Sequence, residues 1–114
     1  MKILITGATG LIGQELGLEL ARRGHQLIII SRSIQKGRLQ APYPCEVIEG
    51  DLSLSPVQDP RLSEVEVVVH LLGEGVAEKR WSPEQKKKIL DSRILSTRNL
   101  ILSLKQAPKV FVSA

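Results

Sequence analysis

The chain has 114 residues, of which 42% are hydrophobic, and its 16 basic and 12 acidic side chains give a net charge of +4. This length suits one small domain with its own core and is too short for two. No apolar run approaches the roughly 20 residues of a membrane span, and we expect no cleavable leader before the first folded-looking segment. Basic residues are scattered and aromatic residues make up 3%, which disfavours a nucleic-acid surface. The single cysteine, Cys45, excludes an internal disulfide, so we expect a cytoplasmic protein. From the apolar runs and the scattered charge we expect no membrane or nucleic-acid partner.

Five short apolar runs predict buried strands, and helical or polar segments separate them. Such alternation implies parallel strands joined by right-handed crossovers. We therefore predict an α/β fold, a Rossmann-like doubly wound parallel sheet of five strands in the order 3-2-1-4-5, truncated after strand five. Segment 33–44 is polar and carries prolines, and segment 53–64 is at best a short helix or a loop. The strands are expected at residues 2–6, 25–32, 45–52, 65–73 and 109–114.

Two segments between these strands predict amphipathic helices. In the first, Ile12, Leu16 and Leu20 fall four residues apart and form one apolar stripe. The second begins at Ser82, an N-cap serine followed by proline, and must end before Pro108. Its buried face is predicted from positions that recur at intervals of four and three, namely Leu90, Ile94, Thr97, Ile101 and Leu104.

Segment 6–13, TGATGLIG, spaces three glycines three residues apart between the first strand and the first helix. In this context Gly7 can make the tight turn, Gly10 lets a pyrophosphate approach the main chain, and Gly13 lets the helix pack closely on the sheet. The free amides and the helix dipole then face the phosphates, whereas a glycine-rich turn without a ligand is the alternative. No Lys-Ser or Lys-Thr follows the glycines, which disfavours a triphosphate P-loop. The predicted phosphate site comprises Gly7, Thr9, Gly10, Leu11, Ile12 and Gly13.

The end of the second predicted strand indicates which dinucleotide would bind. An NAD site usually has an acidic residue there, but this chain has none between Glu19 and Glu46. Ser31 and Arg32 occupy the position instead, and a guanidinium can bind a 2′-phosphate through charge-assisted bidentate hydrogen bonds. The alternative is a solvated strand-end arginine. The sequence therefore predicts NADP in preference to NAD, and it disfavours a flavin.

Two further polar residues follow strands at the edge where ligands bind in such sheets. Asp51, after the third strand, could accept a hydrogen bond from the adenine amino group, or it could simply stabilise a turn. His70 lies within the fourth strand, which favours a core histidine over a catalytic one.

The motifs TGATGLIG, SR after strand two, GDL and the segment 70–100 together resemble extended short-chain dehydrogenases/reductases, specifically an atypical branch of NAD-dependent epimerase/dehydratase-like proteins. The resemblance covers the whole chain. It implies that Gly73 and Glu74 lie near the nicotinamide ribose and that Arg80 and Trp81 lie near the mouth of the active site. Leu72 departs from the small residue common in the family. The cofactor contacts that the resemblance adds are Leu52, Leu71, Leu72, Gly73, Glu74 and Arg93. For Arg93, which could contact cofactor or substrate, the alternative is an ordinary arginine on a helix face.

Members of this superfamily carry out their chemistry with a Tyr-x-x-x-Lys pair, in which the lysine lowers the tyrosine pKa. The single tyrosine, Tyr43, has no lysine four residues later, and Ser113 resembles a strand-end residue and not a catalytic hydroxyl. We therefore expect residues 1–114 to be the N-terminal NAD(P)-binding domain of a longer NADP-dependent oxidoreductase or epimerase, without its catalytic region and substrate domain and inactive alone. The alternative is a non-catalytic dinucleotide sensor or interaction protein. Self-association through the edge of the fifth strand is also expected.

Overall fold

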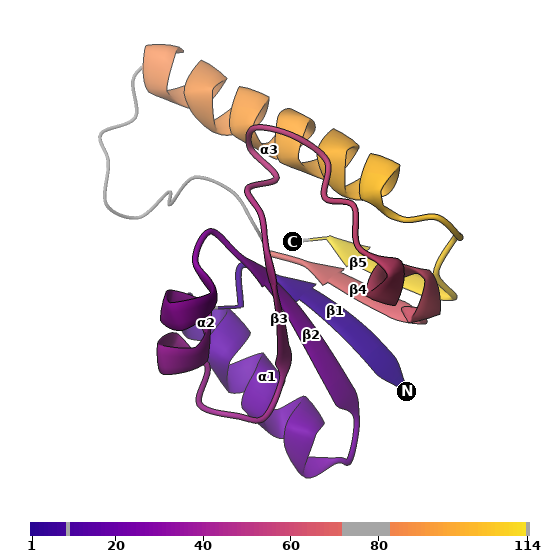
Figure 1. The fold of residues 1–114 in the computed structure, drawn as a ribbon. Helices are drawn as coiled ribbons and strands as arrows, with labels where there is room; N and C mark the ends of the chain where they lie inside the picture. The colour runs from indigo at the N-terminus through magenta and orange to yellow at the C-terminus, as the bar shows by residue number, and fades with distance from the viewer. Residues whose placement is uncertain (9, 72–82, 114) are drawn as a thin grey trace.

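The computed structural model describes residues 1–8, 10–71 and 83–113. They form a five-stranded parallel sheet in the order β3-β2-β1-β4-β5, which confirms the predicted fold (Figure 1). Among these residues no helix is both long enough and apolar enough to cross a membrane. The elements in chain order are β1 (Lys2–Thr6), α1 (Leu11–Arg22), β2 (Gln26–Ser31), α2 (Ile34–Gln40), β3 (Glu46–Glu49), the 3₁₀ helix η1 (Pro60–Glu64), β4 (Val67–His70), α3 (Pro83–Ser103) and β5 (Val110–Ser113).

Strand β1 lies at the centre of the sheet, between β2 and β4. Ile5 is in register with Ile29 of β2, and Thr6 is in register with His70 of β4. Because all five strands are parallel, their carboxyl ends lie along one edge of the sheet. That edge carries the glycine-rich turn after β1 together with the residues that follow β2, β3 and β4, and it is the edge at which open α/β sheets bind ligands.

Two hydrophobic cores lie on opposite faces of the sheet. Helices α1 and α2 cover one face, and α3 with η1 covers the other (Figure 1). Alternate strand residues point to opposite faces, so Ile3 and Ile5 contribute to the first core and Leu4 contributes to the second. The largest fully buried apolar side chains are Leu4, Ile5, Ile28, Ile29, Leu52, Leu62, Leu100 and Val68.

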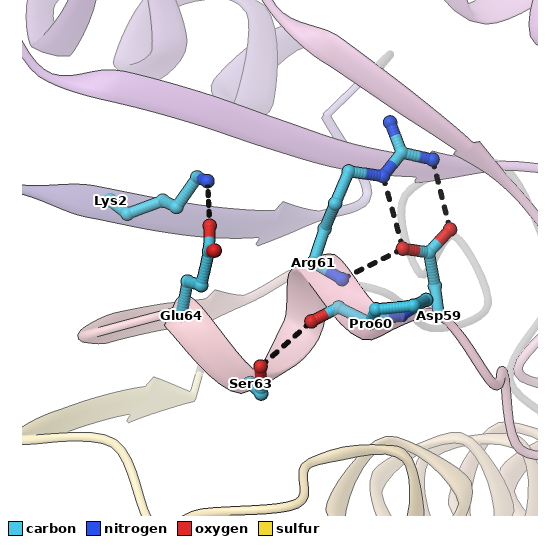
Figure 2. A network of polar contacts seen from close by, with 6 residues as sticks. All are labelled: Lys2, Asp59, Pro60, Arg61, Ser63 and Glu64. Carbon is cyan, nitrogen blue, oxygen red and sulfur yellow. Dashed lines mark hydrogen bonds and ion pairs between the residues drawn. The ribbon is translucent and has the colours of Figure 1, made fainter.

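A network of charged side chains ties η1 to the amino end of β1 (Figure 2). Asp59 caps η1 by accepting from the backbone N–H of Arg61 at 2.9 Å, and its carboxylate also accepts from Arg61 Nε and Nη2 at 3.0 and 2.9 Å. These hydrogen bonds hold the pKa of the Asp59 carboxyl below its usual value. Lys2 of β1 forms an ion pair with Glu64 at the end of η1. The network lies where β1 begins, away from the carboxyl edge.

Segment 33–44, to which the sequence assigned no element, forms α2. Ser33 is its N-cap, and the Ser33 hydroxyl accepts from Lys36 N–H at 3.4 Å. Segment 53–64 contains the short helix η1, as predicted.

The predicted buried face of α3 is wrong for three of its five positions. Leu90, Ile94 and Ile101 are 57%, 58% and 57% exposed. The helix is attached to the fold through polar side chains, because Asn99 Nδ2 donates to the Leu52 carbonyl at 2.7 Å and Ser103 Oγ accepts from the backbone N–H of residue 57 at 2.7 Å. Among the described side chains of α3, the buried ones are Ser96, Asn99, Leu100 and Ser103, so three of these four are small and polar.

Candidate functional site

The turn after β1 has the conformation that the glycine pattern predicts. Gly7 has φ +68°, in the left-handed region where a side chain would be strained. The turn closes through a hydrogen bond of 3.2 Å from Gly10 N to the Gly7 carbonyl, and Gly10 is the N-cap of α1. The chain therefore reverses tightly at the end of β1 and begins a helix over the carboxyl edge.

Close packing between α1 and this turn depends on Gly13. A Cβ atom at Gly13 would lie 2.3 Å from the Gly7 carbonyl oxygen and 2.7 Å from Ala8 Cα. At Gly10 the nearest atom to a Cβ would be the Gly7 oxygen, at 3.4 Å, which is an ordinary contact. Gly13 therefore allows α1 to approach the end of β1 closely. Gly10, which also has no side chain, leaves the backbone of the turn uncovered at its own position.

The amino end of α1 is open to solvent. Gly10 supplies no side-chain cap, and the first turn contains no acidic residue. Leu11 and Ile12 are 79% and 72% exposed. The backbone N–H groups of a first helical turn have no partner within the helix, and the dipole places partial positive charge there. The arrangement is suited to a phosphate group.

The end of β2 brings Arg32 to the same edge. Ser31 is the last residue of β2, and its hydroxyl accepts from Ser33 N–H at 3.4 Å. Arg32 is exposed, and none of the described residues forms an ion pair with it. Because β1 and β2 are neighbours, Arg32 follows the strand adjacent to the one that ends in the glycine turn, and its exposed guanidinium is a cation at the carboxyl edge.

After β3, the structure favours a local role for Asp51. Its Oδ1 accepts from both the backbone N–H and the hydroxyl of Ser53, with 3.0 Å to the nitrogen, which is the turn interaction considered as the alternative. Leu52 is 1% exposed and belongs to the core, and its carbonyl accepts from Asn99. The Leu52 side chain is therefore not available to a ligand at the surface.

At the end of β4, Leu71 is tied to β1. Its backbone N–H donates to the Thr6 carbonyl at 3.2 Å and to Thr6 Oγ1 at 3.1 Å. His70, which is 2% exposed, is a core residue as predicted, and its two ring nitrogens lie near Thr6 and Thr97. Burial lowers the pKa of His70, and the Arg93 charge lowers it further.

The sequence identified the strand ends but not how Thr6 and Thr97 are used. Thr97 was assigned to the buried face of α3 for its spacing alone, and Thr6 only as the start of the motif. The parallel register that pairs Thr6 with His70 could have indicated their contact, but it can be deduced only once the strand order is known. Arg93 is exposed one helical turn before Thr97. The remaining predicted contacts lie outside the described residues, namely Thr9, Leu72, Gly73, Glu74, Arg80 and Trp81.

A hollow of about 420 Å³ lies at the opposite edge, where β1, β2 and β3 begin. Its lining includes Lys2, His25, Cys45 and Glu46, and burial raises the pKa of the Cys45 thiol. These side chains carry mixed charges and none belongs to the glycine turn. The carboxyl edge, not this hollow, combines the features that recognise a nucleotide.

The carboxyl edge carries a glycine turn with bare backbone after β1, and helix α1 packs closely on this turn at Gly13 and is open at its amino end. A cation follows β2 at the same edge. Together these features define a nucleotide-binding domain of the Rossmann type. The chain belongs to the NAD dependent epimerase/dehydratase family, whose sequence model matches residues 3–114.

Similar proteins come from bacteria and mammals. Epimerase family protein YfhF of Bacillus subtilis is 35% identical over 118 aligned positions, which cover 100% of this chain and 37% of that protein. Bovine epimerase family protein SDR39U1 is 32% identical, and the match covers 96% of this chain and 33% of the relative. The chain therefore spans about a third of the length of the curated relatives it matches.

Solved structures agree with this assignment. The crystal structure of human epimerase family protein SDR39U1 (isoform 2) with NADPH is similar with a TM-score of 0.68 and 31% identity, over 99% of this chain and 36% of that one. UDP-N-acetylglucosamine 4-epimerase from Bacillus cereus is similar with a TM-score of 0.57 and 28% identity, over 88% of this chain and 30% of that one.

Proposed function

We propose that this domain binds NADP(H) across the carboxyl edge of β1, β2 and β4. The observation that carries the proposal is the glycine turn, where Gly13 holds α1 against Gly7 and leaves its first backbone amides open for a pyrophosphate. Arg32 supports NADP over NAD, because an exposed guanidinium at the end of β2 matches a 2′-phosphate. The human relative crystallised with NADPH supports the same cofactor.

We further propose that the domain serves as the cofactor-binding part of a longer oxidoreductase or epimerase that uses hydride transfer. The relatives are about three times as long as this chain. Large apolar side chains exposed along α3, namely Leu90, Ile94 and Ile101, are consistent with a surface that another segment covers.

The cofactor proposal is tested by titrating NADPH and NADH against the purified protein and against Arg32→Ala. Loss of a charge-assisted bond costs roughly 1.5–3 kcal/mol, so we expect Arg32→Ala to weaken NADPH about 10- to 100-fold. NADH affinity should change by less than about twofold, because NADH has no 2′-phosphate. Arg38→Ala is the matched control, since Arg38 is an exposed arginine on the nearby α2. Equal affinities for the two cofactors, or no effect of Arg32→Ala, would refute the NADP assignment.

We also propose self-association through β5. Val110, Phe111 and Val112 are 49%, 38% and 46% exposed on an edge strand, and unpaired edge strands pair readily with other chains. Size-exclusion chromatography should show a concentration-dependent dimer that Val112→Lys reduces. A monomer at all concentrations would contradict this proposal.

A further inference from the structure

A chain of three buried or partly buried side chains connects three elements beneath the glycine turn. Thr6 Oγ1 of β1 lies 2.6 Å from His70 Nδ1 of β4, and His70 Nε2 lies 3.0 Å from Thr97 Oγ1 of α3. Thr6 and His70 are 1% and 2% exposed. We refer to these residues as the Thr–His–Thr chain. A histidine suits the middle position because its two ring nitrogens can bond on opposite sides at once.

Both ends of the Thr–His–Thr chain reach groups of the proposed cofactor site. Thr6 immediately precedes Gly7, and Thr6 Oγ1 also accepts from the backbone N–H of Leu71, the residue at which the polypeptide leaves β4. At the other end, Thr97 lies one helical turn after Arg93. The imidazole therefore fixes the position of α3 relative to the turn that would receive the pyrophosphate.

We infer that His70 is a positioning residue for the dinucleotide, which in its neutral form locks α3 onto the end of β1 and so sets the geometry of the glycine turn and Leu71. This inference rests on the proposed function, since it assigns His70 a role in that same site. A purely structural histidine would support the stability of the fold without changing cofactor affinity, and the two roles can therefore be separated by experiment.

The surroundings of His70 favour the neutral ring. Thr6 faces it from β1, Thr97 from α3, and the Phe111 ring from β5 with its centroid 6.2 Å away and tilted by 53°. Arg93 of α3 is the charged group among the described residues whose field reaches it. Desolvation first and this positive charge second lower the His70 pKa, so the folded protein disfavours the imidazolium.

The direction of the pH effect follows from this. The unfolded chain takes up a proton near pH 6.5 and the folded protein takes it up at a lower pH, so stability is full above about 6.5 and falls as the pH drops below it. Protonation of His70 would place a cation in a buried site within the field of Arg93, loosening the link between α3 and β1. Cofactor affinity is a property of the folded protein, so it is expected to fall only at the lower pH at which folded His70 takes up its proton.

The first experiment compares hydroxyl variants on α3 at pH 7.5, measuring NADPH affinity by calorimetry and stability by urea unfolding. Thr97→Val keeps the shape of the side chain but removes the partner of His70 Nε2, and we expect it to weaken NADPH about three- to tenfold. Thr97→Ser keeps the hydroxyl and should restore most of the affinity. Ser96→Ala is the control, because Ser96 is 1% exposed on the same helix and its hydroxyl donates to the Arg93 carbonyl at 3.3 Å, not to His70.

The outcomes separate the two roles. A loss of stability in Ser96→Ala without a change in NADPH affinity, together with weaker binding in Thr97→Val, supports positioning. If Thr97→Val lowers stability but leaves NADPH affinity within about 1.5-fold of the wild type, the inference is overturned.

The second experiment varies the pH. The chain has two histidines, so His25→Gln and His70→Gln form a matched pair. The NADPH 2′-phosphate itself titrates near pH 6, and this contribution is common to all variants. Below pH 6.5, across the range in which folded His70 takes up its proton, the wild type and His25→Gln should lose more affinity than His70→Gln does. If NADPH affinity depends on pH equally in all three proteins, the inference is overturned.

A third measurement does not need cofactor and covers the case in which His70→Gln fails to fold. Nitrogen NMR of the imidazoles, with His70 assigned by comparison with His25→Gln, should show His70 as a neutral tautomer at about pH 6.5, because burial lowers its pKa. If His70 instead takes up its proton at or above about pH 6.5, the inference fails. If the wild type does not bind NADPH at all, the proposed function fails, and this NMR result still decides whether the buried ring is held neutral.

Discussion

Helices α1 and α3 cover opposite faces of one sheet, but different kinds of contact hold them in place. Helix α1 buries Gly13 and Gly17, with Leu16 and Leu20 packed against the core beside them. Among the described side chains of α3, Asn99 and Ser103 are buried and bond the main chain of segment 52–57, and Ser96 and Leu100 are buried as well. Glycines bring the first helix close to the strands, whereas directional hydrogen bonds hold the second helix over its face.

This difference teaches where each helix tolerates change. Close packing of backbone against backbone leaves no space for an added atom, so α1 should be sensitive to volume. A helix held by a few hydrogen bonds should be sensitive to loss of those particular groups and insensitive along its exposed side. The predictions that follow compare these sensitivities, beginning with the largest effect.

Gly13→Ala should have the largest effect. The added carbon would sit 2.3 Å from the Gly7 oxygen and 2.7 Å from Ala8 Cα, both backbone atoms that can move only if α1 shifts. We expect a loss of about 3 kcal/mol in the free energy of unfolding, measured in urea, because overpacking of this kind strains the backbone.

Gly10→Ala is the control for Gly13→Ala, since its added carbon would have 3.4 Å to the nearest atom. Its stability should stay within about 0.5 kcal/mol of the wild type. Similar losses for both glycine variants would contradict the view that the close approach of α1 to β1 decides the result, because of the two only Gly13 lacks space for a Cβ atom.

On α3, Asn99→Ala should lower the free energy of unfolding more than Ile101→Ala does, although the isoleucine side chain is larger and apolar. Asn99 is 6% exposed, and its removal leaves the buried Leu52 carbonyl without its bond of 2.7 Å, which costs about 2 kcal/mol. Ile101 is 57% exposed, and its truncation should change the free energy of unfolding by less than about 0.5 kcal/mol. Denaturant titration of both variants tests this order, with the dependence of the free energy of unfolding on denaturant concentration compared between them. The reverse order would mean that the apolar flank of α3 is covered in solution.

The smallest expected effect is a gain. Tyr43 packs its ring against Gly17 of α1, and its buried hydroxyl has no hydrogen-bond partner among the described residues. Burial raises the pKa of Tyr43 to about 12. Tyr43→Phe keeps the ring and removes the unsatisfied group, so thermal unfolding should show a change between zero and a gain of about 1 kcal/mol. A loss above that size would indicate that the hydroxyl is hydrogen-bonded in solution, for instance to a trapped water.

The sheet could be predicted from the sequence because its strands are continuous apolar runs and its crossovers have one allowed hand. Helix α2 could not, since a seven-residue helix containing Gly37 has too little periodicity to be recognised. The buried face of α3 was misassigned because the spacing of residues shows only where apolar side chains recur. It cannot register that Asn99 and Ser103 find main-chain partners in a loop some 46 to 47 residues away in sequence.

The candidate site divides in the same way. The glycine turn is a local feature, so its spacing alone indicated how Gly7 and Gly13 are used. Arg32 was identified because the strand end is a local signal as well. The contacts of His70 were not predictable, since they join β1, β4 and α3 and depend on strand register and on the rotation of a helix.

Leu11 and Ile12 stand in water at the start of α1, 79% and 72% exposed, although each is a large aliphatic residue. Any ligand that lies over the first turn must withdraw this surface from solvent, and removal of aliphatic area from water lowers the heat capacity. Calorimetry of cofactor binding at several temperatures should therefore give enthalpies that become more negative on warming, even though the ligand is an anion bound largely through its charges.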